Sequence, residues 1–124
     1  MKQLLDTHAL LWVLGGDKRT PECLRTDLAG TRGDLLVSDV SIWEIAIKKS
    51  LGRLDVPEDL PLIIDESGFG QIPIKTSHLW AVRNLEPIHG DPFDRLLVAQ
   101  ALEEGMTLAT SDRDLGRYGV PTRW

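Results

Sequence analysis

The sequence predicts an α/β protein built on a mostly parallel sheet. Short apolar segments, typical of buried strands, alternate with segments of helical length from one end of the chain to the other. One helical segment, residues 95–102, is apolar on nearly every side, which indicates a helix in the centre of the fold rather than on its surface. The 124 residues are enough for one domain, expected over residues 1–124.

The first strand is expected to run into an acid. Residues 2–5 form the strand, and Asp6 lies where it stops. A helix follows over residues 7–14 and is closed by the glycines at 15 and 16, which can adopt the left-handed conformation that ends helices. Asp6 is therefore placed at the carboxyl end of a buried strand.

A second acid lies inside an apolar helix. Ser38 ends the next strand and is a natural cap for a helix over residues 38–49. Glu44 then lies among bulky apolar neighbours, where a carboxylate is costly unless it is paired or coordinated. The alternative is a local capping box between Ser41 and Glu44, which would make the acid structural.

The remaining elements frame these positions without a readable motif. Residues 20–30 predict a helix capped by Thr20, and Pro73 marks an edge strand. The expected ranges are a helix over 21–29, a strand over 34–38, a helix over 57–67, a short strand over 71–74 and a helix over 76–85. The stretch from Asp55 to Leu85 gives no indication of its role.

A third acid opens the apolar helix. Asp91 can cap it, and Pro92 fits the first helical position, where no N–H is needed. Asp94 lies three residues after the cap, where the helix dipole favours a carboxylate. A capping box between Asp91 and Asp94 is the structural alternative, and it leaves no chemistry for Asp94.

A fourth acid follows the last long strand. Residues 106–110 predict a strand that ends near Asp112. Ser111 and Asp114 match a capping box for a short helix, so Asp114 is assigned a structural role and Asp112 a chemical one. Residues 120–124 could add a final short strand.

Composition limits the classes of protein. The single cysteine, Cys23, cannot form an internal disulfide, and it indicates a reducing compartment. The apolar runs fall short of the roughly 18 residues that a membrane span needs, and Asp6 interrupts the N-terminus where a signal peptide would be apolar. A cytoplasmic protein without a membrane partner is expected.

The net charge of −5 at first argues against a nucleic-acid partner. If four acids form one metal cluster, however, the rest of the chain carries about −1 (−5 + 4), and bound cations would offset the cluster.

The spacing predicts that the four acids share one pocket. Parallel sheets bind ligands at the carboxyl ends of their strands, and these acids follow strands or open helices there. Bare carboxylates within a few ångströms repel one another unless a cation lies between them. An all-oxygen site suits Mg²⁺ or Mn²⁺, which most often serves phosphoryl chemistry by activating a water. The set is Asp6, Glu44, Asp94 and Asp112.

No side-chain nucleophile with a known motif accompanies the acids. The sequence has no Gly-x-Ser-x-Gly and no phosphate-binding Walker loop. The three histidines, His8, His78 and His89, are scattered. His89 is near the expected site and could contact substrate, although a loop histidine is more often simply polar.

Four segments together resemble the PIN-domain family, and more narrowly its VapC-type toxins of bacterial toxin–antitoxin pairs. They cover the whole chain in the right order and comprise residues 4–12 (LLDTHALLW), 41–45 (SIWEI), 91–101 (DPFDRLLVAQA) and 110–112 (TSD).

The resemblance implies a three-layer α/β/α sandwich with a sheet of four to five strands. It also implies a Mg²⁺- or Mn²⁺-dependent endoribonuclease whose acidic quartet carries over to Asp6, Glu44, Asp94 and Asp112, with no departure in the quartet. Thr7, Thr110, Ser111 and Asp91 are supporting candidates. The implied partners are RNA (tRNA or another structured RNA being candidates), a cognate antitoxin and a second copy of the chain in a homodimer.

Two other functions stay open at this stage. The chain could be a catalytically silent binding module that keeps the acids as a relic. It could also be a phosphatase or phospho-acceptor that uses Asp6 as nucleophile. Such enzymes usually place a second acid two residues on, where this chain has His8, and the last 49 residues contain no lysine for the pocket. The sequence does not identify the RNA, the antitoxin, the number of metal ions or the dimer surface.

Overall fold

A computed structural model describes residues 2–30 and 32–124. Five strands form one sheet in the order β3-β2-β1-β4-β5, and every neighbouring pair is parallel. The strands are β1 (Gln3–Leu5), β2 (Leu35–Ser38), β3 (Gly70–Ile72), β4 (Thr107–Ala109) and β5 (Thr122–Arg123). The predicted α/β fold with a mostly parallel sheet is therefore confirmed.

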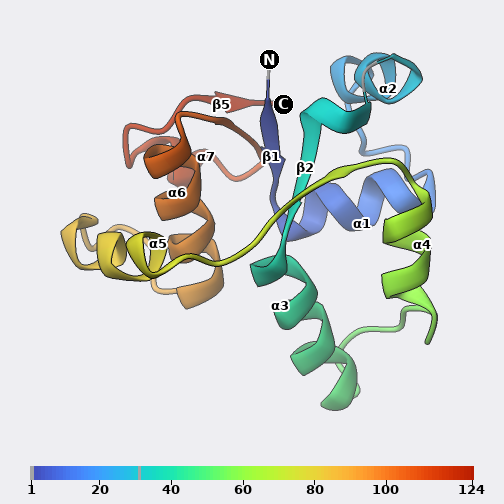
Figure 1. Cartoon of the computed structure of the whole chain (residues 1–124), viewed down its shortest axis with the longest axis horizontal. Coiled ribbons are helices and arrows are strands. Elements are labelled where there is room, and N and C mark those ends of the chain that lie inside the picture. The colour runs from blue at the N-terminus through green and yellow to red at the C-terminus, as the bar shows by residue number, and fades with distance from the viewer. Residues whose placement is uncertain (1, 31) are drawn as a thin grey trace.

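Helices cover both faces of the sheet, which makes three layers (Figure 1). The α-helices are α1 (Thr7–Gly15), α2 (Glu22–Ala29), α3 (Asp39–Ser50), α4 (Leu60–Glu66), α5 (Thr76–Ala81), α6 (Pro92–Glu104) and α7 (Arg113–Gly116). Short 3₁₀ turns cover Arg32–Asp34 and Val82–Asn84.

Alternating side chains of the strands build two apolar cores. Leu4 and Leu108 belong to a core that includes side chains of α6 and α7. Leu5 and Ala109, one residue further along the same strands, belong to a second core that includes side chains of α1, α2 and α4. This period of two is what a strand buried on both faces requires, and it explains why β1 and β4 are apolar throughout.

The strand ends place the acids at one edge of the sheet. Leu5 of β1 is in register with Ala109 of β4, and the Asp6 N–H donates to the Ala109 carbonyl oxygen at 3.1 Å. The residues that follow β1 and β4 therefore lie side by side at the carboxyl edge of the sheet. Ser38 ends the neighbouring strand β2 and caps α3 by accepting from the Val40 N–H at 3.0 Å.

Several predicted helix ends differ from the structure. Thr20 does not cap α2, because Pro21 takes the cap position and the buried Thr20 hydroxyl has no hydrogen-bond partner among the described residues. Helix α4 begins at Leu60 rather than at residue 57, and α5 ends at Ala81 with a 3₁₀ turn behind it. None of these differences affects the acids.

Across the described ranges, 2–30 and 32–124, no helix is both long and apolar enough to cross a bilayer.

Candidate active site

Three of the predicted acids cap helices at the carboxyl edge of the sheet. Asp6 is buried and accepts from the Ala9 N–H at 2.8 Å at the start of α1. Asp112 accepts from the Asp114 N–H at 2.9 Å at the start of α7. Asp91 accepts from the Phe93 N–H at 2.8 Å at the start of α6. These carboxylates are therefore held in fixed positions by backbone groups that would otherwise lack partners.

The predicted cap of α7 is corrected. Asp112 and not Ser111 holds the cap position, while Ser111 is exposed. Thr110, the other supporting hydroxyl near the last acid, is buried and accepts from the Asp112 N–H at 3.0 Å. Thr110 also hydrogen-bonds the Asp6 side chain, so it links the first and the last acid.

Asp94 is the electrostatic centre of the group. Burial, and after it the charges of Asp91, Glu44 and Asp6 in that order, raise the pKa of Asp94 to about 7, while the charge of His89 opposes the rise. Four acids, from the starts of α1 and α6 and from the interior of α3, therefore act on one another. Only half of the Asp91–Asp94 capping box forms. Asp91 Oδ1 accepts from the Asp94 N–H at 3.3 Å, but the Asp91 N–H donates to the His89 ring and not to the Asp94 side chain.

Asp6 shows the same competition between burial and charge. Burial raises the pKa of Asp6, and the charge of Asp112 acts in the same direction. The Thr110 hydrogen bond, the Ala9 N–H and the charge of His8 oppose that rise in the pKa of Asp6. Asp6 and Asp112 therefore interact across the ends of β1 and β4.

Glu44 is buried in α3, and both of its oxygens are engaged. Thr7 donates its hydroxyl to Oε1 at 2.6 Å, and the Ser41 hydroxyl lies 3.0 Å from the same Thr7 oxygen. The ammonium of Lys48 lies 2.5 Å from Oε2. The local Ser41–Glu44 capping box is thus replaced by a contact across to α1, because Ser38 is the cap of α3.

Lys48 is a site residue that the sequence interpretation missed. Its pKa is raised chiefly by the hydrogen bond to Glu44, and the charges of Asp91 and Asp94 add to that effect. The signal was present, since Glu44 and Lys48 have the i, i+4 spacing of a helical ion pair. Lys48 supplies the positive charge nearest to Glu44 while its side chain stays about one-third exposed.

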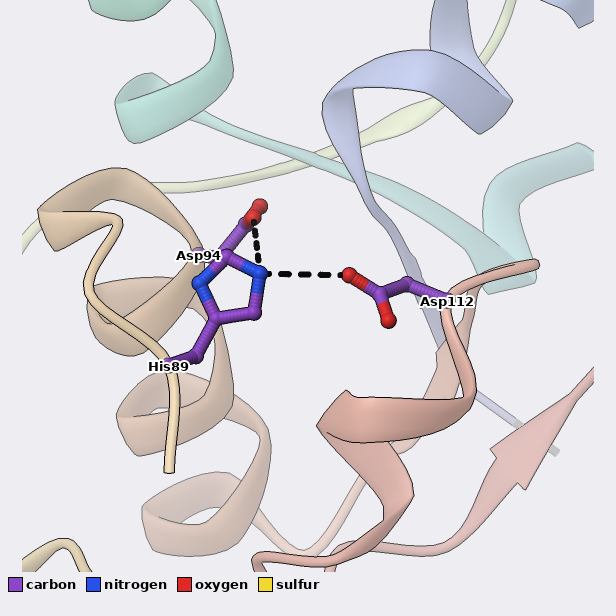
Figure 2. A group of neighbouring side chains, drawn as sticks. All are labelled: His89, Asp94 and Asp112. Carbon is purple, nitrogen blue, oxygen red and sulfur yellow. Dashed lines mark ion pairs between the residues drawn. The ribbon is translucent and has the colours of Figure 1, made fainter. Parts of the chain in front are cut away.

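His89, which the sequence interpretation placed near the expected site, lies between two of the acids. Its Nε2 atom lies 3.3 Å from Asp112 Oδ2 and 3.7 Å from Asp94 Oδ2. Figure 2 shows the ring between the two carboxylates, which approach it from α6 on one side and α7 on the other. One ligand atom from each of the three residues lies within 4.8 Å of the others.

The donor set fits a divalent cation. Carboxylate oxygens are the ligands of Mg²⁺ and Mn²⁺, and Asp94, whose pKa is raised by burial and by the charges of Asp91, Glu44 and Asp6, faces several of them. Asp94 and Asp112 are best placed to hold an ion, with Asp6 next to them. Glu44 faces the same charges but is paired with Lys48.

The sequence matches the model of the PIN domain family over residues 4–121. The chain belongs to the PIN domain family. No curated protein sequence matches it.

Solved structures show the same fold at low sequence identity. A chain of the VapBC2 complex from Rickettsia felis, which is bound to a DNA fragment from the VapBC2 promoter, matches with a TM-score of 0.74 and 15% identity over 99% of this chain and 98% of that chain. A chain of DNA-bound VapBC from Salmonella typhimurium matches with a TM-score of 0.74 and 18% identity over 99% and 97%. A toxin–antitoxin complex from Klebsiella pneumoniae gives a TM-score of 0.67 and 18% identity over 99% and 97%.

Proposed function

We propose that residues 1–124 form one PIN domain that acts as a VapC-type toxin, a Mg²⁺- or Mn²⁺-dependent endoribonuclease. The observation that carries the proposal is the convergence of carboxylates on the half-buried Asp94, whose pKa burial and then these neighbouring charges raise to about 7. A protein gains nothing in stability from such repulsion, so the arrangement favours a bound cation. The resemblance of the four motif segments to VapC-type toxins supports the RNA substrate.

In this proposal Asp6, Asp94 and Asp112 hold the metal ion. When bound, a divalent cation lowers the pKa of a water and offsets charge on the phosphate and the leaving oxygen. Thr7 and Lys48 fix the Glu44 carboxylate, which faces the same space and helps to hold metal or orient the water. The helix caps at Asp6 and Asp112 keep those two side chains from turning away.

The proposed protein partner is a cognate antitoxin. The structural neighbours include toxin–antitoxin complexes, which supports a cognate antitoxin for this chain. An apolar groove of about 580 Å³ lies beside α1, lined by side chains that include Trp12, Leu54 and Leu60, and it suits an apolar segment of such a partner. We place the protein in the cytoplasm. Mass spectrometry of the proteins that copurify with it from its own cells tests whether it binds an antitoxin.

A homodimer is the proposed assembly. Trp43 on α3 and Leu79 and Trp80 on α5 are large apolar side chains that are more than half exposed. Single exposed apolar residues are common on surfaces, but Leu79 and Trp80 are adjacent on α5 and favour an interface. Light scattering of the purified chain and of Trp80→Glu would measure the assembly, and we expect the variant to be monomeric.

The function is tested by incubating total cellular RNA with purified protein and Mg²⁺ or Mn²⁺. EDTA and Asp94→Asn are the controls. We expect discrete fragments only with metal and intact Asp94, and sequencing of their ends would identify the target RNA. Cleavage that persists in Asp94→Asn would contradict the proposal. Absence of both cleavage and a metal effect on thermal unfolding would support a silent binding module.

A further inference from the structure

His89 lies in the loop before α6, and the proposed metal chemistry gives it no role. Its side chain is about one-quarter exposed, and its Nε2 atom faces Asp112 and Asp94. The three residues together have the residue types of a metal site. The hydrogen bonds of the ring, however, point to a different role.

The backbone decides which ring nitrogen carries the proton. The Asp91 N–H donates to His89 Nδ1 at 3.1 Å, so Nδ1 is the acceptor and the ring proton lies on Nε2. The N–H at Nε2 is directed at the Asp112 and Asp94 carboxylates, which accept but do not donate when ionised (Figure 2). His89 is therefore held as a hydrogen-bond donor at the centre of the site.

A second set of contacts fixes the loop that carries this ring. The Tyr118 hydroxyl accepts from the His89 N–H at 2.7 Å, and Arg95 Nη1 donates to the same hydroxyl at 3.2 Å. Arg95 also donates to the Glu86 carbonyl oxygen at 2.9 Å. The loop is thus fastened to α6 and to the turn after α7, and the ring has little freedom to exchange its two nitrogens.

This arrangement is the opposite of a metal-binding histidine. A histidine that binds metal through one nitrogen normally donates the N–H of the other to a carbonyl or carboxylate. Here the other nitrogen already accepts an N–H, so binding a cation through Nε2 would leave two donors facing each other at Nδ1. The cation is left to the carboxylates.

We propose that His89 is a substrate-contacting residue that donates its Nε2–H to a phosphate oxygen of the RNA and does not ligate the metal. A cation that occupies the Asp94 and Asp112 oxygens takes away the acceptors that Nε2–H has in this structure. A phosphate oxygen of a bound RNA would then be the acceptor for Nε2–H, because phosphate oxygens are the commonest acceptors of protein hydrogen bonds in nucleic-acid complexes. This inference rests on the proposed ribonuclease function.

The first part of the test measures metal binding alone. Mn²⁺ is titrated into wild type, His89→Phe and His89→Gln and followed by electron paramagnetic resonance, with Asp94→Asn as the positive control. We expect dissociation constants that stay within about threefold of wild type or become tighter in the His89 variants, and no nitrogen coupling to the bound Mn²⁺. Binding weakened about tenfold or more in His89→Phe, or a nitrogen coupling that this variant abolishes, would overturn the proposal.

The second part measures cleavage of an RNA that wild type cuts. Phe keeps the ring without a donor, and Gln offers an amide N–H in place of Nε2–H. Because one lost donor to a reacting oxygen costs about 10²-fold in rate, we expect His89→Phe to lower kcat by that order, with partial recovery in His89→Gln. A wild-type rate in His89→Phe would refute the role of His89. If wild type itself cleaves no RNA, it is the ribonuclease proposal that fails.

Discussion

Helix α6 contributes side chains to two polar clusters. In one, like charges face each other, and in the other, the polar groups are hydrogen-bonded. At the start of α6, Asp94 faces other carboxylates, and burial together with their charge raises its pKa to about 7. Two turns further on, Gln100 is buried, its Oε1 accepts from the Ser38 hydroxyl at 2.5 Å, and its Nε2 donates to the Pro73 carbonyl oxygen at 3.3 Å. One cluster is repulsive and the other is satisfied.

The satisfied cluster extends to an ion pair at the surface. His78 is buried, its Nδ1 accepts from the Lys75 N–H, and its Nε2 lies 2.9 Å from Glu104. The hydrogen bonds from His78 and Lys75 lower the pKa of Glu104, which is the reverse of the shift at Asp94. A polar network with complete hydrogen bonding specifies packing. Carboxylates that repel one another in the folded protein are instead typical of a binding site.

The largest effect is expected from Asp94→Asn. Losing a ligand that holds the cation should lower RNA cleavage by about 10³-fold or more, since several kcal/mol of charge stabilisation are lost. The same change removes the carboxylate repulsion, so in EDTA at pH 8 we expect the free energy of unfolding to rise by about 1–3 kcal/mol. Urea unfolding measures the second quantity.

The control is wild type at pH 4. Asp94 has a folded-state pKa raised from 3.8 to about 7, so the folded protein holds its proton more tightly than the unfolded chain does. This contribution to stability is present below about pH 4 and is lost as the pH rises to 7. The difference between Asp94→Asn and wild type should therefore shrink at low pH. A difference that does not change with pH would contradict the assignment.

The next effect is on metal affinity as a function of pH. A cation must displace the proton of Asp94, so we expect the dissociation constant for Mn²⁺ to weaken about tenfold for each pH unit below 7. Isothermal titration calorimetry between pH 5.5 and 8 in two buffers measures both the affinity and the proton released. A flat profile in this range would show that Asp94 does not bind the ion.

The buried network should respond in the opposite way. Gln100→Met keeps the length of the side chain but leaves the Ser38 hydroxyl and the Pro73 carbonyl oxygen without their partner. We expect a loss of about 2–3 kcal/mol in unfolding free energy, with kcat per folded molecule changed by less than about threefold. Gln71→Met on the exposed face of β3 is the matched control. A large fall in kcat with normal stability would mean that the network is part of the site.

The two clusters also differ in how well the sequence predicts them. Asp6, Asp94 and Asp112 follow strands or open a helix, and in a parallel sheet such positions share one edge, so local pattern was enough to bring them together. The capping roles of Ser38 and Asp91 are local as well and are confirmed. The fold class follows from the same alternation of elements.

The Gln100 network and the position of the ring proton on His89 could not be predicted from the sequence. Gln100 meets Ser38 across 62 positions of sequence, and no local signal selects that pair. The position of the ring proton on His89 depends on the Asp91 N–H. Asp91 is the N-cap of α6, so its N–H is not needed within the helix and donates to the His89 ring. Thr20 shows the converse error, since a good local cap residue lost the position to Pro21.

The smallest effect, and the sharpest test of where Glu44 belongs, is expected from Lys48→Met. Lys48 pairs with Glu44, and the charges of Asp91 and Asp94 also act on it. Its positive charge therefore repels a cation that enters the site. Its side chain is about one-third exposed, which limits the effect to about 0.5–1 kcal/mol. We expect Mn²⁺ to bind about two- to fivefold more tightly to the variant, while Lys49→Met, which removes a contact with the Val56 carbonyl oxygen, leaves the affinity unchanged. Weaker Mn²⁺ binding in Lys48→Met would mean that the ion pair holds Glu44 in a ligand position, and Glu44 would then join the three aspartates as a direct ligand.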